Sequence, residues 1–113
     1  MAGKYILHPA GDSQFHWDLK GANATKILSS QLYAAKAGAQ TGIRSCRDNS
    51  GDESRYERLT SKDTRPYFVL KAANGEIIGT SQMYSSETAR DHGIASCKEN
   101  GPSAATQDNT AKL

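Results

Sequence analysis

An internal duplication is the feature that most restricts how this 113-residue chain can fold. Residues 4–54 align with residues 55–105 at a constant offset of 51 without a gap, and fifteen of the 51 aligned pairs are identical. The identical pairs include Tyr5/Tyr56, Leu19/Leu70, Lys20/Lys71, Ser30/Ser81, Gln31/Gln82, Tyr33/Tyr84, Gly42/Gly93, Cys46/Cys97 and Asn49/Asn100. Chance would match only a few pairs, so the chain is a tandem repeat and its fold must be built from two similar units.

The hydrophobic pattern of each repeat predicts three short strands followed by a helix. In the second copy, the first two strands are expected at 56–59 and 67–71, and the helix at 86–99, with Ser85 as its N-cap. The first-copy counterparts are strands at 5–8 and 15–20 and a helix at 34–48. Gly42 and Gly93 lie in mid-helix, where glycine costs about 1 kcal/mol relative to alanine. Their recurrence predicts close contact of each helix with the sheet or with its twin.

The Asn-Gly dipeptide ending at Gly75 predicts a tight turn between the second and third strands of the second copy. A two-residue loop would place Leu70 opposite Gly79. A three-residue loop, with Gly75 in the left-handed conformation, would place Leu70 opposite Ile78, and we favour it because it gathers the apolar residues on one face. The first copy has Ala24 at this position, where a positive φ costs roughly 1 kcal/mol, so its hairpin is expected to be looser.

One repeat of about 51 residues is too small to bury much apolar surface by itself. We therefore expect an α+β fold in which two β(3)-α repeats, related by a pseudo-twofold axis, merge into one antiparallel sheet with both helices on one face. Residues 1–105 are expected to form this single domain, with repeats at 4–54 and 55–105, as a monomer that imitates a homodimer. The polar segment 106–113 is expected to be a disordered tail.

Composition and charge exclude several classes of protein. Fourteen Lys and Arg against twelve Asp and Glu give a net charge of +2, and no run of five or six like charges occurs, which argues against a dedicated duplex-DNA binder. No segment resembles a secretory signal or a membrane span, so a cytoplasmic location without membrane contact is expected. Cys46 and Cys97 form no CxxC pair or zinc-type cluster and are interpreted as reduced thiols that pack on the helices.

Three elements of the second copy resemble the YegP-like family of small bacterial proteins, which contain one or two copies of a domain of unknown function. They are Leu-Lys-Ala-x-Asn-Gly at 70–75, Ser-Gln-x-Tyr at 81–84 and Gly-Ile-x-Ser-x-Lys-x-Asn at 93–100. The resemblance covers nearly the whole chain, although the first copy is more divergent. It implies a β(3)-α repeat and allows an extra C-terminal strand per copy that crosses to the other half. It implies no activity, substrate or catalytic residue.

The repeated Ser-Gln-x-Tyr motif lies where a strand passes to a helix, at Ser81, Gln82 and Tyr84 in the second copy. Its side chains are expected to satisfy backbone groups and to anchor the start of the helix. Together with Lys71, the same side chains would be suited to line the polar pocket of an enzyme or of a small-molecule-binding protein.

Histidines give no metal signal in the sequence. His8, His16 and His92 have no partners at metal-ligand spacing, and His92 corresponds to Thr41 in the other copy. No nucleophile elbow, phosphate-binding loop, HExxH motif or carboxylate pair is present either. No metal, cofactor or catalytic residue is therefore predicted.

The sheet face that the helices leave free is the remaining candidate surface. It would present His16, Tyr67, Lys20 and Lys71 as a small platform for stacking on bases and contacting phosphates. The leading hypothesis is a non-enzymatic binding module whose partner, a protein or a nucleic acid, reaches this face or the pseudo-twofold groove. The alternatives are the small-molecule protein or enzyme described above and a weak binder of single-stranded nucleic acid. A closed pocket around the motif would favour an enzyme, and a flat open face would favour a binding module.

Overall fold

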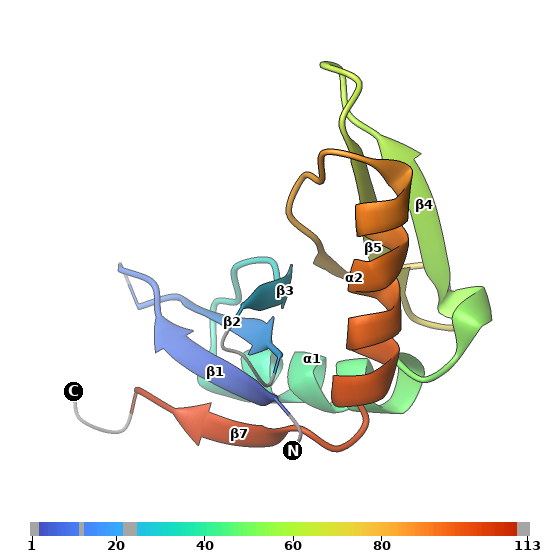
Figure 1. Cartoon of the computed structure of the whole chain (residues 1–113). Coiled ribbons are helices and arrows are strands. Elements are labelled where there is room, and N and C mark those ends of the chain that lie inside the picture. The colour runs from blue at the N-terminus through green and yellow to red at the C-terminus, as the bar shows by residue number, and fades with distance from the viewer. Residues whose placement is uncertain (1–2, 12, 22–24, 111–113) are drawn as a thin grey trace.

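The computed structural model describes residues 3–11, 13–21 and 25–110 (Figure 1). The first repeat comprises β1 (Lys4–Pro9), β2 (Phe15–Lys20), β3 (Lys26–Ser29) and α1 (Lys36–Asn49). The second comprises a short 3-10 helix η1 (Glu53–Arg55), β4 (Tyr56–Thr60), β5 (Pro66–Lys71), β6 (Ile77–Thr80), α2 (Glu87–Asn100) and a last strand, β7 (Ala105–Asp108). The predicted order of three strands and a helix is present in both repeats.

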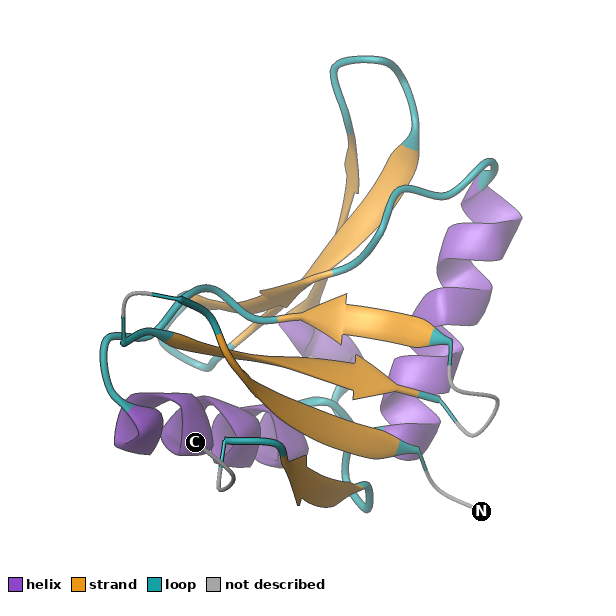
Figure 2. Cartoon of the chain, turned by 90° about the vertical axis from the view of Figure 1, so that its left-hand side faces the viewer, coloured by secondary structure: helices purple, strands orange, loops and turns teal. Residues whose placement is uncertain are grey.

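Seven strands form one sheet in the order β4-β5-β6-β3-β2-β1-β7 (Figure 2). The two repeats join where Ser29 of β3 pairs with Thr80 of β6. These residues are counterparts at the offset of 51, so the pseudo-twofold axis passes through their pairing. The expectation of an antiparallel sheet is correct for the other pairings but wrong for one, because β7 runs parallel to β1. The sheet is therefore mixed.

The turn between β5 and β6 has the predicted three-residue loop but not the predicted register. Gly75 adopts the left-handed conformation, with φ at 86°, as expected. An extra residue in β6 then places Leu70 opposite Gly79 instead of Ile78. The extra, unpaired residue of this β-bulge is Ile78. Its side chain is still buried in the core, because a bulge shifts the register of the strand without changing the loop. The corresponding turn of the first repeat, at Ala24, lies outside the described residues.

The helices begin slightly later than predicted, and the expected N-cap of α2 is wrong by one residue. Ser86, not Ser85, has the extended backbone of a cap, and its hydroxyl oxygen accepts a hydrogen bond from the Ala89 N–H at 3.1 Å. This bond satisfies one of the N–H groups that the first turn leaves free. Within the described residues, neither helix has the length and apolar character needed to cross a membrane.

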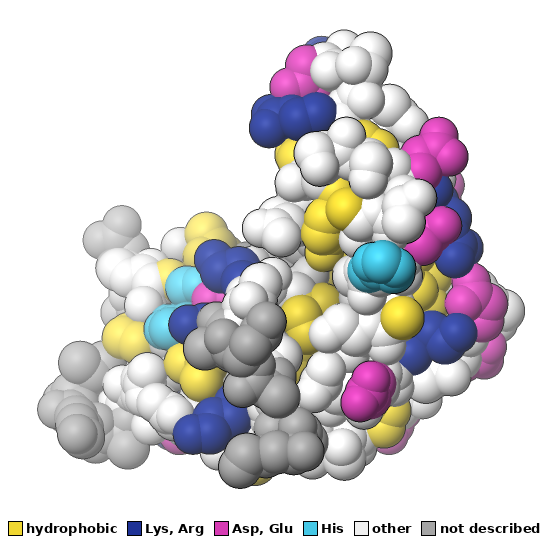
Figure 3. All heavy atoms as spheres, viewed as in Figure 1, with side chains coloured by type: hydrophobic (Ala, Val, Ile, Leu, Met, Phe, Trp, Pro, Cys, Tyr) yellow, Lys and Arg dark blue, Asp and Glu magenta, His cyan; other side chains and the backbone are white. Residues whose placement is uncertain are grey.

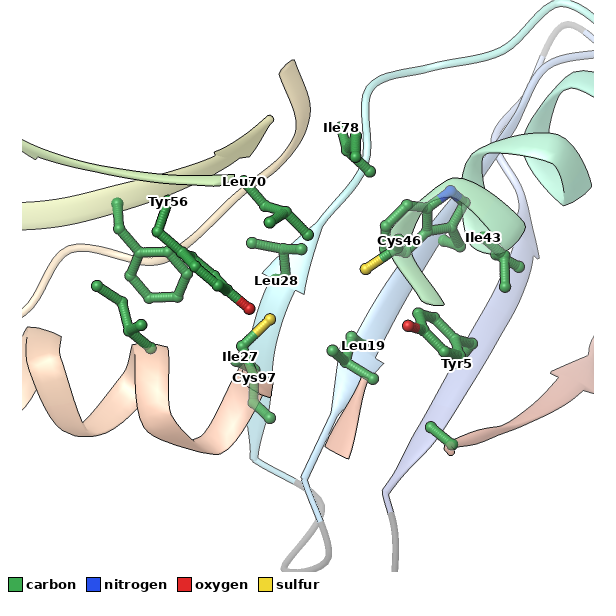
Figure 4. Packing of buried hydrophobic residues seen from close by; sticks show 14 of the residues in the cluster. Tyr5, Leu19, Ile27, Leu28, Ile43, Cys46, Tyr56, Leu70, Ile78 and Cys97 are labelled. Carbon is green, nitrogen blue, oxygen red and sulfur yellow. The ribbon is translucent and has the colours of Figure 1, made fainter. Parts of the chain in front are cut away.

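Both helices pack on the same face of the sheet, over one hydrophobic core to which both repeats contribute (Figure 4). Its completely buried side chains include Tyr5, Leu7, Trp17, Leu19, Leu28, Cys46, Phe68, Leu70 and Cys97. The same aromatic contact occurs in each half, with ring centroids 5.6 Å apart for Tyr5 and Trp17 and 5.7 Å apart for Tyr56 and Phe68. Because the interior is continuous, each half covers apolar surface that the other would leave exposed.

Gly42 and Gly93 lie where each helix passes closest to the sheet. A Cβ atom at Gly42 would collide with the Tyr33 hydroxyl and come within 2.9 Å of Trp17 Nε1. A Cβ atom at Gly93 would collide with the Tyr84 hydroxyl in the same way. The predicted close approach is confirmed, and its partners are aromatic side chains of the same repeat rather than the twin helix.

The expected disordered tail, 106–113, instead contributes most of β7. Its four strand residues all have exposed side chains, so the segment lacks the alternation that reveals a half-buried strand. β7 forms because edge strand β1 offers unpaired backbone groups. Arg47 donates to the Ala104 carbonyl at 3.0 Å, and Lys36 pairs with Asp108 at 2.7 Å. β7 thus follows the second repeat and crosses to the first, and the end of the expected tail lies outside the described residues.

Candidate functional site

The uncovered sheet face carries the four residues of the predicted nucleic-acid platform, but it does not join them into one surface. His16 and Lys20 lie on β2, and Tyr67 and Lys71 lie on β5. Strand alternation turns all four side chains away from the helices. Two strands, β3 and β6, separate the pairs, which corresponds to roughly 14 Å at the usual strand spacing. The face therefore divides into two halves, one for each repeat.

The Ser-Gln-x-Tyr motif serves the fold. The Ser81 hydroxyl accepts a hydrogen bond from the Phe68 N–H at 3.0 Å and donates one to the Gln82 carbonyl at 2.8 Å. Ser30 makes the corresponding two bonds in the first repeat. Tyr84 stacks on Phe68, with ring centroids 6.3 Å apart. These contacts agree with the structural interpretation of the motif.

Tyr84 and Lys71 lie on opposite faces of the sheet, so they do not surround one pocket with the rest of the motif. Tyr84 packs under α2, and burial raises the pKa of its hydroxyl. Lys71 forms an ion pair with Glu57 on the uncovered face. Strand alternation therefore keeps Lys71 out of any pocket that Tyr84 could line.

His8, His16 and Asp18 form a compact cluster on the uncovered face of the first repeat. The register of β1 and β2 places His8 opposite His16, and their imidazoles stack with centroids 4.9 Å apart. Asp18 Oδ2 lies 3.2 Å from His8 Nε2 and 3.8 Å from His16 Nε2. Histidine side chains are visible together over β1 and β2 in Figure 3, whereas His92 lies exposed on α2. The prediction that the histidines lack partners is therefore wrong for His8 and His16.

Asp18 is the buried member of this cluster. Its side chain is 6% exposed, compared with 30% for His8 and 31% for His16. The Ser29 hydroxyl donates a hydrogen bond to Asp18 Oδ1 at 2.7 Å, which orients the carboxylate and leaves Oδ2 facing the imidazoles. Lys26 Nζ lies 3.9 Å from Oδ1. Burying a carboxylate is costly unless it is paired, and these neighbours supply its partners.

The second repeat shows that the fold does not need this polar cluster. At the offset of 51, the counterparts of His8, His16 and Asp18 are Leu59, Tyr67 and Val69. Counted over the whole residue, Val69 is 3% exposed and Asp18 is 4% exposed, so an apolar side chain occupies the same buried place in the twin. The cluster is thus an addition to the first repeat rather than a structural requirement of the repeat.

Three lysines form a row across the same half of the face. Lys4 lies opposite Lys20 in the β1–β2 pairing, and Lys20 lies opposite Lys26 in the β2–β3 pairing. Neither Lys4 nor Lys20 forms an ion pair with another described residue. In the second repeat, by contrast, Glu57 neutralises Lys71. Like charges directly opposite each other on neighbouring strands are destabilising, so the row marks a surface suited to an anion.

The cysteines lie in the core, as expected. Cys46 and Cys97 are both free and completely buried. Burial raises the pKa of the Cys97 thiol to about 11 and raises that of the Cys46 thiol above its usual range. Thiols with raised pKa values are poor nucleophiles at neutral pH, so this part of the core offers no reactive sulfur.

Comparison with known proteins agrees with the repeat architecture. A family model described as a domain of unknown function, DUF1508, matches twice in tandem, at residues 10–57 and 61–108. The chain belongs to the DUF1508 family. The two matches begin 51 residues apart, which is the offset found within the sequence. The resemblance to YegP-like proteins is confirmed by the relatives described next.

Relatives share both the sequence and the fold of this DUF1508 protein. A UPF0339 protein of Acinetobacter baylyi is 52% identical over 97% of this chain and 99% of its own length. The UPF0339 protein YegP of Escherichia coli O157:H7 is 51% identical over 97% of this chain and 100% of its own. The solution NMR structure of yegP from E. coli, described as a protein of unknown function, has a TM-score of 0.91 at 49% identity and covers 98% of this chain and 96% of that one. The solution NMR structure of UPF0339 protein SO3888 from Shewanella oneidensis has a TM-score of 0.89 at 50% identity and covers 96% of this chain and 92% of that one.

Sequence reasoning missed His8 because metal-ligand spacing was sought along the chain rather than across a hairpin. Pro9 and Phe15 are paired at the start of the β1–β2 hairpin, so the next residues outward, His8 and His16, must face each other. Asp18 lies two residues further along β2 and therefore on the same face as His16. Extending the hairpin register outward from the turn was the signal that would have found the cluster.

Proposed function

We propose that this DUF1508 protein is a non-enzymatic binding module of the cytoplasm that contacts single-stranded nucleic acid through the uncovered face of its first repeat. The observation that carries the proposal is the row formed by Lys4, Lys20 and Lys26. Phosphates of a flexible strand are suited to bridge such a row, because they follow its direction across the sheet and neutralise its charge.

The binding is expected to be weak and mainly electrostatic. His8 and His16 stack on each other, so their ring faces are partly occupied. Tyr67 lies in the other half of the face and is separated from Lys20 by β3 and β6. Base stacking therefore adds little, and phosphate contacts dominate.

The remaining parts of the proposal concern location and assembly. The free thiols of Cys46 and Cys97 agree with a reducing compartment such as the cytoplasm. The helices of both repeats already bury their apolar faces against one sheet in a single core, which supports a monomer that needs no second copy to complete its interior.

An NMR titration with short single-stranded RNA and DNA tests the proposal. At low salt, amide shifts are expected on β1, β2 and β3 and not on the helices. Lys20→Gln should weaken binding several-fold. It should also reduce the slope of log affinity against log salt concentration by about 1, which corresponds to the loss of one phosphate contact. Lys71→Gln is the matched control, since Lys71 occupies the equivalent position but is already paired with Glu57.

Two outcomes would contradict the proposal. The first is the absence of shifts with any oligonucleotide at low salt. The second is equal weakening by Lys20→Gln and Lys71→Gln, which would mean that overall charge rather than the lysine row is responsible. A parallel titration with a metabolite mixture tests the enzyme alternative, for which shifts around Ser81, Gln82 and Tyr84 are expected instead.

A further inference from the structure

We infer that His8, His16 and Asp18 form a binding site for a divalent first-row transition cation such as Zn²⁺. The inference goes beyond the proposed function, because it names a different ligand and requires no nucleic acid. It rests on the geometry of the three side chains, on their chemistry and on their absence from the second repeat.

The distances suit one small cation. In a regular tetrahedral zinc site with bonds of about 2.0–2.1 Å, neighbouring ligand atoms are about 3.3–3.4 Å apart. The distances from Asp18 Oδ2 to the Nε2 atoms of His8 and His16 are 3.2 and 3.8 Å. The three ligand atoms lie within 4.8 Å of one another, and the two nearly parallel imidazoles would turn about their side-chain bonds so that both Nε2 atoms point at one cation.

The donor set selects the class of cation. Two imidazole nitrogens and one carboxylate oxygen suit Zn²⁺, Fe²⁺, Ni²⁺ and Cu²⁺, whereas Mg²⁺ and Ca²⁺ prefer oxygen ligands throughout. Three protein ligands leave at least one coordination position free. Since His8 and His16 are about one-third exposed, that position faces solvent and is available to water or to a ligand atom of another molecule.

The rest of the fold leaves the His16 imidazole without a hydrogen bond to any described residue, and the Nδ1 atom of the ring is buried without a partner among them. The ring stacks on that of His8, and its Nε2 atom lies 3.8 Å from Asp18 Oδ2. A cation bound there would give Nε2 the strong interaction that the rest of the fold does not supply.

Ser29 has the role of a positioning residue. Its hydrogen bond to Asp18 Oδ1 fixes the carboxylate so that Oδ2 faces both imidazoles. Groups that orient metal ligands in this way typically change metal affinity 10- to 100-fold when removed. The second repeat has Thr80 at this position and so offers a conservative replacement that keeps the hydroxyl.

The internal repeat also supplies a variant that should fold. Replacing His8→Leu, His16→Tyr and Asp18→Val gives the first repeat the side chains that the second repeat already carries in the same framework. This triple variant removes all three ligand side chains. His92→Gln is the matched control, because it removes an exposed histidine outside the cluster.

Calorimetric titration of the full chain with ZnCl₂, followed by NMR of the imidazole resonances, tests the site. One equivalent should bind, the His8 and His16 resonances should shift, and the same titration with MgCl₂ should show no binding. The triple variant should lose at least a hundredfold in zinc affinity, and His92→Gln should retain the parent affinity. Ser29→Ala should weaken binding about tenfold, and Ser29→Thr should restore it.

Three results would overturn the inference: no zinc binding by the parent chain, binding that survives in the triple variant, or shifts centred on His92. None of them depends on the oligonucleotide titration, which is performed without added metal. Failure of the metal site and failure of the proposed nucleic-acid contact can therefore be distinguished.

Discussion

The Tyr5 hydroxyl donates a buried hydrogen bond of 2.8 Å to the Gly101 carbonyl, which lies just beyond α2 in the other repeat. The counterpart of this bond runs in the opposite direction, from the Tyr56 hydroxyl to the Ser50 carbonyl just beyond α1, at 2.6 Å. Each repeat thus uses the tyrosine of its first strand to satisfy a carbonyl at the end of the other repeat's helix. The exchange links the halves through polar contacts as well as through the shared core.

Removing either hydroxyl should therefore destabilise the whole molecule. Tyr5→Phe and Tyr56→Phe are each expected to lower the free energy of unfolding by about 1–3 kcal/mol, because each leaves a buried carbonyl without its donor. Urea denaturation measures the change. Tyr67→Phe is the control, since the Tyr67 hydroxyl makes no hydrogen bond to a described residue, and a similar loss there would contradict the explanation.

Gly42→Ala should be destabilising even though alanine favours helices. Alanine in a helix is about 1 kcal/mol better than glycine, but the added Cβ would collide with the Tyr33 hydroxyl. We expect a net loss of about 1–3 kcal/mol by chemical denaturation. Gly42→Ala should cost less stability in a Tyr33→Phe background than in the parent chain, because the hydroxyl that it would meet is then absent. A stabilising effect of Gly42→Ala in the parent chain would disprove the close contact.

Stability should fall at alkaline pH because of the buried thiols. Burial raises the pKa of Cys97 from an ordinary value of 9.0 to about 11. The native state therefore disfavours the thiolate. The contribution of the neutral Cys97 thiol to the free energy of unfolding is complete below pH 9 and is lost as the pH rises toward 11. The loss from Cys97 is roughly 2 kcal/mol. Urea denaturation between pH 8 and pH 11 measures it, and Cys97→Ala should show a smaller decrease with pH than the parent chain.

The docking of β7 should depend on pH in the acid range. The ion pair with Lys36, followed by hydrogen bonds from Thr110, lowers the pKa of Asp108 from 3.8 to about 2. The stabilisation that the charged Asp108 carboxylate gives to docked β7 is present above pH 4 and is lost as the pH falls through 2. The protection of β7 amides against exchange, relative to the intrinsic rate at each pH, should fall over that interval, and Asp108→Asn should lower it already at pH 5. Asp63→Asn, in the distant β4–β5 hairpin, should leave β7 unchanged.

The triple replacement His8→Leu/His16→Tyr/Asp18→Val is expected to preserve the fold. Replacing a buried charged group with well-packed apolar side chains is often neutral or stabilising by about 1–4 kcal/mol, and Val69 shows that the repeat accepts valine at this position. Thermal unfolding and the pattern of NMR amide shifts measure the outcome. A marked loss of stability would mean that the cluster has become part of the framework of the first repeat.

Local sequence patterns predicted much of the fold. The strands, the helices and the inward-facing Trp17, Leu19, Phe68 and Leu70 follow from hydrophobic periodicity, which depends on near neighbours in the chain. The pairing of Leu70 with Gly79 instead of Ile78 was not predictable in the same way, because a bulge changes the register without changing the loop.

The candidate site was less accessible to sequence reasoning. His16 and Lys20 were correctly placed on the uncovered face, but His8 and Asp18 were not recognised as their neighbours. Pattern analysis of single strands assigns a side chain to a face and does not say which residue stands beside it. That information depends on the pairing of strands and is absent from the periodicity of either one.

The amino-acid sequence was enough to establish the duplication, the three strands and one helix that both repeats share, and the side chains that fill the core. These features follow from hydrophobic periodicity, which is a property of residues close together in the chain. Tertiary structure alone brought His8, His16 and Asp18 within reach of one ion and carried β7 across to β1. Both arrangements depend on backbone hydrogen bonds between strands, within the β1–β2 hairpin for the cluster and between segments distant in the chain for β7, which form wherever a paired strand or a free edge presents matching groups.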